Sequence, residues 1–230
     1  NKVIIDKNKE EVIKYIKKKA GATTPTSIQL NSIKGIDSAI EGIVYGTVLQ
    51  NGKYNDKTNP TILEINKVIL NFNKVINYIK NQQETTPPTY TELNSITGID
   101  SAIEGIVYGT DLQLKVNYID NTNPTIEEIN GAINFINVTA FINSNALIKE
   151  VTHIQLNSIT GIDSAIEGIE YGTTLRVERN DIDKTKPTIE EINTVILNFN
   201  KVINYIKKQP GTTAPTFTEL NLIIGIDSAI

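Results

Sequence analysis

The stretch PTIEEINTVILNFNKVINYIKK, residues 187–208, decides the fold class of this chain. Its apolar side chains recur three and four residues apart, the spacing of one face of an α-helix. They are Ile189, Ile192, Val195, Ile196, Phe199, Val202, Ile203 and Ile206. The pattern predicts a long amphipathic helix from Thr188 to about Lys208. Because residues 69–80 are identical to residues 196–207, a second long helix is predicted from Thr61 to about Lys80.

A Thr-x-x-Glu/Gln pattern marks the start of each predicted helix. In such a capping box the Thr hydroxyl accepts a hydrogen bond from the backbone amide three residues on, and the Glu or Gln side chain accepts one from the Thr amide. Seven copies begin at Thr26, Thr61, Thr89, Thr125, Thr152, Thr188 and Thr216. All but Thr152 follow a Pro, which holds the entering chain extended. The copies predict seven helix starts.

The capping boxes belong to two alternating motifs with a combined period of about 63 residues. The sequence Gly-Ile-Asp-Ser-Ala-Ile begins at Gly35, Gly98, Gly161 and Gly225, and Pro-Thr-Ile-x-Glu-Ile-Asn begins at Pro60, Pro124 and Pro187. We predict an all-α tandem repeat with a short, a medium and a long helix per unit, forming an extended helical array. The predicted parts are 1–24 (the end of a long helix plus its linker), 25–87, 88–150 and 151–214 (three repeats) and 215–230 (the start of a fourth).

Further elements are predicted between the short and the long helix of a unit. After the short helix that starts at Thr89, Asp100 is expected to cap the medium helix, from Ser101 to about Tyr108. The residues Leu112, Leu114 and Val116 alternate with polar ones, so a short strand is one interpretation of the linker that follows. The Thr/Pro linkers at 85–88 and 212–215 are expected to be stiff extended spacers.

The middle long helix departs from the pattern of the other two. Its sequence changes at residues 137–143, and residues 145–150 stand where a Thr/Pro linker is expected. The most similar long helices therefore lie about 127 residues apart, which indicates an array of double units. The opening residues 11–26 resemble the end of a long helix, because Tyr15-Ile16-Lys17-Lys18 matches residues 205–208.

The composition limits the chemistry available to the chain. It contains no Cys, which excludes disulfides, thiolate zinc sites and cysteine nucleophiles. The net charge of −4 does not favour a general nucleic-acid binder, and the lysines of residues 14–19 are expected to be a solvated helix end. No apolar run approaches the roughly 18 residues that span a membrane. Since Asn1 is not an initiator Met, we expect a processed or excised piece of a longer protein.

No residue cluster predicts a catalytic, cofactor or metal site. The single histidine, His153, lies in a first helical turn and has no nucleophile partner in the pattern, so we expect a structural position. The pairs Glu127–Glu128 and Glu190–Glu191 lie in capping boxes, where the helix dipole accounts for them better than a glycosidase mechanism does.

Two recurring features fit a ligand as well as a structural role. The oxygen-rich loops 55–59, 120–123 and 181–185 have the side chains that calcium prefers, although turn formation before a helix is the favoured interpretation. The tyrosines that precede a Gly once per unit fit a ligand ladder, but a core position at a helix end is favoured. These tyrosines are Tyr45, Tyr108 and Tyr171.

From Pro25 onward the chain alternates Pro-Thr-x-x-Glu-Leu-Asn-x-Ile-x-Gly-Ile-Asp-Ser-Ala-Ile with Pro-Thr-Ile-Glu-Glu-Ile-Asn-x-Val-Ile. This alternation resembles the helical tandem repeats of very large bacterial cell-surface and adhesin-like proteins. Those repeats pair a Thr/Pro-led Gly-Val-x-x-Val-x-x-Ala-Ile element with an Ala-Glu-Ile-Gln-x-Ile-Val-x-x-Val-Asn helix. The resemblance implies a spacer or the body of a fibre, and it identifies no site.

We therefore predict a non-enzymatic structural or spacer region of an extended bacterial cell-surface or extracellular fibre. Its partners would be neighbouring repeats of the same or a longer chain, with no nucleic acid, no cofactor and no membrane span. One alternative is a binding module whose repeat face recognises a host protein or glycan, which would expose apolar patches at equivalent places. Another is a self-assembling filament subunit. A polar cleft confined to one repeat would favour an enzyme.

Overall fold

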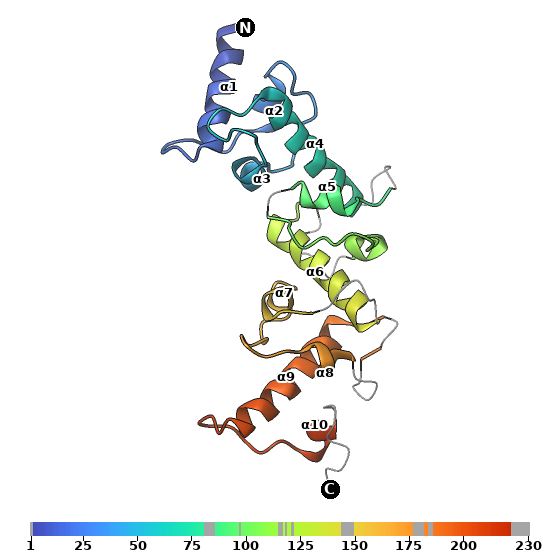
Figure 1. Ribbon diagram of the computed structural model, residues 1–230. Helices are drawn as coiled ribbons and strands as arrows, with labels where there is room; N and C mark the ends of the chain where they lie inside the picture. The colour runs from blue at the N-terminus through green and yellow to red at the C-terminus, as the bar shows by residue number, and fades with distance from the viewer. Residues whose placement is uncertain are drawn as a thin grey trace. The chain divides into compact units, whose positions relative to one another are not determined.

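The computed structural model describes residues 2–80, 86–96, 98–114, 117, 119–120, 122–143, 150–176, 182–183 and 186–221 (Figure 1). All regular secondary structure in these ranges is helical, which confirms the all-α prediction for them. The elements are α1 (Lys2–Ile16), α2 (Ser27–Asn31), α3 (Gly46–Asn51), α4 (Ile62–Ile79), α5 (Tyr90–Asn94), the 3₁₀ helix η1 (Thr110–Gln113), α6 (Ile126–Ile142), α7 (His153–Asn157), α8 (Gly172–Arg176), α9 (Ile189–Ile206) and α10 (Phe217–Asn221).

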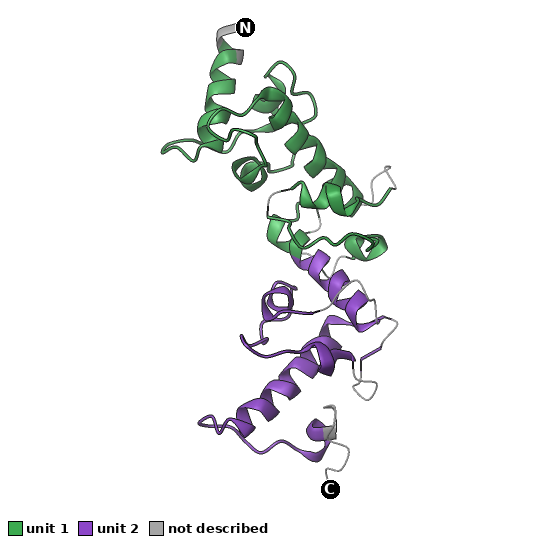
Figure 2. Cartoon of the chain, in the orientation of Figure 1, with its two compact units in different colours: residues 1–130 green, residues 131–230 purple. Residues whose placement is uncertain are grey.

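The chain divides into two compact units, residues 1–130 and 131–230 (Figure 2). In unit 1, α3 packs against both α1 and α4, and α4 also contacts α5 and η1. In unit 2, α9 contacts α8 and α10. None of the helices in the described ranges combines the length and apolar character that crossing a bilayer requires.

Every predicted capping box forms. At α2 the Thr26 hydroxyl accepts from the Gln29 amide at 3.2 Å, and the Gln29 side chain accepts from the Thr26 amide at 2.9 Å. The same reciprocal pair of hydrogen bonds is present at Thr61, Thr89, Thr125, Thr152, Thr188 and Thr216. The seven predicted helix starts are confirmed, because a capping box needs only residues that are neighbours in sequence.

The predicted medium helix from Ser101 to Tyr108 is wrong. Two of its first backbone amides donate to side chains, and the Ile106 amide donates to the Ile103 carbonyl at 3.3 Å in a turn. The Asn94 side chain accepts from the Ala102 amide at 3.1 Å and donates to the Ala102 carbonyl at 2.7 Å. The next amide, that of Ile103, donates to the Tyr108 hydroxyl at 2.7 Å. A turn replaces the helix, and the short helix η1 begins only after Tyr108.

The same turn forms after α2 and α7. The side chains of Asn31 and Asn157 each accept from and donate to the backbone of an alanine eight residues on. The amides of Ile40 and Ile166 each donate to a tyrosine hydroxyl at 2.8 Å. In the linker after η1, Leu112 lies in that 3₁₀ helix and Val116 lies outside the described residues, so the alternative of a strand finds no support at Leu112.

The recurring tyrosines are core residues, as the favoured interpretation predicts, but they precede a helix start and do not end a helix. Tyr45, Tyr108 and Tyr171 are among the largest fully buried side chains of the described residues. The Tyr45 hydroxyl donates to Asn73 Oδ1 of α4 at 2.5 Å, and its ring meets that of Phe72 edge to face at 6.1 Å. Tyr171 makes the equivalent contacts with α9, so Tyr45 and Tyr171 each connect a turn to a long helix.

The long helices differ in how much of their surface is buried. In α4, and in α9 before its last turn, most of the apolar stripe is buried and the opposite face is exposed, as the period of 3.6 predicts. In α6 all residues from 131 to 138 are buried. A Cβ at Gly131 would lie only 2.4 Å from the Ser158 carbonyl oxygen, so glycine allows α6 to approach the end of α7. The departure of the middle helix from the repeat pattern thus reflects its deeper burial.

Replacing Tyr45 by Phe is expected to lower the free energy of unfolding by about 1–3 kcal/mol, because the buried Asn73 oxygen and the Ile40 amide would each lose a partner. Urea denaturation measures the loss. The control is Tyr205→Phe in the exposed last turn of α9, which should change the value by less than about 0.5 kcal/mol. Equal effects of the two substitutions would contradict the fastening role of Tyr45.

Candidate functional site

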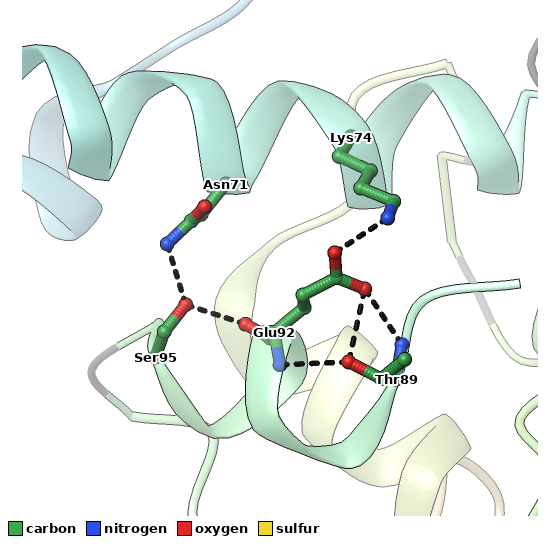
Figure 3. Close-up of polar contacts among 5 residues, drawn as sticks. All are labelled: Asn71, Lys74, Thr89, Glu92 and Ser95. Atoms are coloured by element: carbon green, nitrogen blue, oxygen red, sulfur yellow. Dashed lines mark hydrogen bonds and ion pairs between the residues drawn. The ribbon is translucent and has the colours of Figure 1, made fainter.

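The best-defined polar cluster of unit 1 joins the long helix α4 to the short helix α5 (Figure 3). The Lys74 ammonium lies 2.5 Å from Glu92 Oε1. The other carboxylate oxygen, Glu92 Oε2, accepts from the Thr89 amide at 2.8 Å and from the Thr89 hydroxyl at 3.0 Å. Glu92 therefore caps its own helix and binds the neighbouring helix at the same time.

A second contact fixes the other end of α5. Asn71 Nδ2 of α4 donates to Ser95 Oγ at 2.7 Å, and this hydroxyl donates to the Glu92 carbonyl at 2.6 Å (Figure 3). We call Asn71, Lys74, Thr89, Glu92 and Ser95 the helix clamp. Because the helix clamp contacts both the first and the last turn of the five-residue helix α5, it fixes the position of α5 along α4.

Parts of the helix clamp occur at other junctions. The Asn-to-Ser hydrogen bond of 2.7 Å also joins Asn8 to Ser32 and Asn134 to Ser158. The ion pair recurs between Lys201 of α9 and Glu219 of α10, at 2.7 Å. The sequence analysis missed these residues, although the 63-residue spacing of Asn8, Asn71 and Asn134 was a visible signal.

The lysine and the capping glutamate of the clamp vary together within the chain. Where the long helix carries Glu11 in place of Lys, the capping residue is Gln29, and both line one small hollow. Glu11 instead pairs with Lys14 on its own helix. The middle helix carries Asn137 at this position, and its capping residue is Gln155. A carboxylate thus caps the short helix at the two junctions where a lysine faces it.

The second junction holds the Gly-Ile-Asp-Ser-Ala-Ile motif against the start of the next long helix. Ser38 Oγ donates to Asn66 Oδ1 at 2.7 Å, and Ser101 and Ser164 donate to equivalent asparagines. The glycine of the motif has a φ of 96° at Gly35, and its missing Cβ would lie 3.2 Å from Ile62 Cγ2. Both the left-handed backbone and the close approach explain why glycine stands here.

Two of the loops considered for calcium use an aspartate as a turn acceptor. Asp56 Oδ1 accepts from the Thr58 hydroxyl at 2.6 Å and the Thr58 amide at 2.8 Å, and these hydrogen bonds lower the Asp56 pKa. Asp120 and Thr122 repeat the arrangement. Only two residues of the loop 181–185 are described. Over the ranges that the structure describes, no three His, Asp or Glu side chains gather as a metal site would require.

The paired glutamates lie in the first turns of their helices. Glu128 and Glu191 each accept from the amide of the capping threonine at 2.8 Å. Burial acts to raise the Glu128 pKa, but hydrogen bonds from Thr125 and Ile119 outweigh it, so the pKa lies below its ordinary value. These contacts are those of a capping box.

A hollow of about 600 Å³ in unit 2 is lined by His153 together with Glu150, Glu170 and Arg176. Arg176 Nε donates to the Phe141 carbonyl at 2.8 Å, and its guanidinium lies 3.7 Å from the Phe141 ring centroid. The hydroxyl of Thr152, which also lines the hollow, donates to Gln155 Oε1 at 3.1 Å. This arrangement contains no described pairing of a nucleophile with a base.

Comparison of the chain with protein-family models, with curated proteins and with solved structures found no match.

The substitution Glu92→Gln should cost less than about 1 kcal/mol, because it removes a half-exposed ion pair and keeps the capping box, as Gln29 and Gln155 do. Glu92→Ala removes both contacts and should cost about 1 kcal/mol more. Urea denaturation of the two variants distinguishes them. If Gln and Ala proved equally costly, Glu92 would not act as a cap.

The free energy of unfolding should depend on pH through the carboxylates of the capping boxes. Amides of Asn55 and Thr61 lower the Glu64 pKa, and Lys201 lowers the Glu219 pKa, below the ordinary 4.5. Lowered pKa values favour folding above that value, and the contribution is lost as pH falls through the folded-state pKa. We expect the urea midpoint to fall between about pH 5 and about pH 3.5.

The double variant Glu64→Gln/Glu219→Gln is the matched control for this pH dependence. Its capping boxes are retained, since glutamine caps α2 and α7, but neither side chain can be protonated. Its urea midpoint should fall less on acidification than that of the parent chain. An identical fall in both proteins would show that other groups control the acid response.

Proposed function

We propose that this chain is a non-catalytic structural region, built as a tandem array of units about 63 residues long. Residues 25–87, 88–150 and 151–214 would form three units, preceded by the end of a long helix in 1–24 and followed by the start of a fourth in 215–230. The role of such a region is to set a distance, as a spacer or the body of an extended fibre.

The observation that carries this proposal is the return of the same contacts at the same spacing. Within the residues that the structure describes, the Asn-to-Ala turn, the Ile-to-Tyr hydrogen bond and the Ser-to-Asn hydrogen bond each occur three times, about 63 residues apart. A lone unit of this size buries about 60% of its unfolded surface and is marginally stable. Contact with neighbouring units supplies the missing burial.

The use of the polar side chains also supports a structural role. The Thr, Asn, Ser and Tyr side chains of the repeating motifs bond to backbone groups or to one another, as in the helix clamp. The resemblance to repeats of bacterial cell-surface and adhesin-like proteins supports a location outside the cell. We therefore place the chain, as a proposal, in a bacterial surface or extracellular fibre.

Small-angle X-ray scattering of the chain over a concentration series tests the array. An extended array predicts a monomer mass and a radius of gyration well above the roughly 17 Å of a 230-residue globule. A value near that of a globule would contradict it. A mass that rises with concentration would instead favour the filament subunit over the spacer.

A further inference from the structure

The last turns of three long helices are buried under a later segment of the chain. Each helix ends in an aromatic residue followed by Ile, and these side chains are at most 9% exposed. The pairs are Tyr15–Ile16 of α1, Tyr78–Ile79 of α4 and Phe141–Ile142 of α6. Thirty residues after each aromatic comes the sequence Tyr-Gly-Thr-x-Leu, at Tyr45, Tyr108 and Tyr171. This sequence forms the covering helix.

The covering helices contact the helix ends in the same way. Gln50 of α3, Gln113 of η1 and Arg176 of α8 donate to the carbonyls of Tyr15, Tyr78 and Phe141, at 3.4, 2.9 and 2.8 Å. At two of these sites the glycine of the motif makes room for the aromatic ring, whereas a Cβ at Gly109 would meet only Val107, at 3.7 Å. A Cβ at Gly46 would lie 2.7 Å from the Tyr15 hydroxyl, and one at Gly172 would lie 2.9 Å from Phe141.

The end of α9 has the same residues, but none of the described segments buries it. Tyr205 is 46% exposed and Ile206 is 67% exposed. With Lys208, Gln209 and Thr212 they line a hollow of about 460 Å³. The carbonyl of Tyr205 accepts from the Lys208 amide at 3.0 Å, just as the covered Tyr15 carbonyl accepts from Lys18, and a carbonyl can accept a second hydrogen bond.

The backbone that follows α9 already has the conformation found at the covered end of α1. Lys18 and Lys208 both have a φ of 52°, and Gly21 and Gly211 have φ values of 79° and 80°. The amide of Lys19 donates to Lys14 at 3.1 Å, and the equivalent bond after α9 measures 3.0 Å. Covering this end therefore requires no rearrangement of its backbone.

We infer that the end of α9, formed by Tyr205, Ile206, Lys208, Gln209 and Thr212, is the docking site for a Tyr-Gly-Thr-x-Leu-Gln helix of a following repeat unit. The leucine and tyrosine of that helix bury Ile206 and Tyr205, and its glutamine donates to the Tyr205 carbonyl. The inference rests on the proposed array. It identifies the surface through which the array is extended.

The test is to lengthen the chain. Residues 225–230 match residues 35–40, so the sequence of residues 41–80 is appended after Ile230 to complete one unit. Hydrogen–deuterium exchange is measured at residues 203–207 in the original and the lengthened chain. We expect exchange there to slow by at least about tenfold on lengthening, toward the rate of the covered end of α1.

Two single substitutions serve as matched controls. Ile206→Asp should leave the melting temperature of the original chain unchanged, because Ile206 is exposed, yet remove the slowing in the lengthened chain. Ile154→Asp changes an equally exposed isoleucine of α7, 69% accessible, and should leave the slowing intact.

Unchanged exchange at residues 203–207 in the lengthened chain would overturn the inference, as would slowing that survives Ile206→Asp. Protection that grows with concentration in the original chain would also overturn it, since the occupant would then be a second copy. These outcomes are independent of the array, which the scattering experiment tests: an elongated chain with an unprotected α9 end would refute the docking site alone.

Discussion

A helix of five residues does not persist in water, because isolated helices shorter than about 12–15 residues are marginal. Helices α2, α5 and α7 are of this length, and each is held at both ends by side chains. A capping box satisfies the first turn, and an asparagine of the preceding long helix bonds the serine at the last. The short helices are therefore stabilised by their contacts at the junction. The turns that follow them, the buried tyrosines and the covering helices take their positions from these short helices.

The elements that could be predicted from the sequence are those whose causes are local. The long helices α4 and α9 follow from apolar spacing, and all seven helix starts follow from capping boxes. The prediction of the medium helix was wrong because the Asn94 side chain bonds to Ala102, eight residues on, and the Ile103 amide donates to the Tyr108 hydroxyl. Hydrogen bonds from backbone groups to side chains several residues away produce no periodic pattern in the sequence. Asp100 was the residue that predicted a helix cap here, and that cap does not form.

The helix clamp could not be predicted from the sequence for a similar reason. The glutamate of each capping box was identified from its spacing to Thr, but its second partner lies on another helix, 18 residues away in the case of Lys74 and Glu92. The contact was indicated only by the way in which the residues at these two positions change together from one repeat to the next. The burial of the tyrosines was predicted correctly, since a large recurring aromatic side chain is usually a core residue, but they precede helix starts where a helix end was expected.

Lys74 pairs with Glu92, whereas Glu11 and Gln29 only line one hollow, and this difference has a consequence for how the length of such a chain can change. Removing residues 25–87 would bring Glu92 beside Glu11, and two carboxylates would meet where one lysine and one carboxylate met before. Removing residues 25–150 would bring Gln155 there instead, which matches the original neighbour. Loss of one unit would therefore place like charges at this contact, whereas loss of two would restore the original pair of residues.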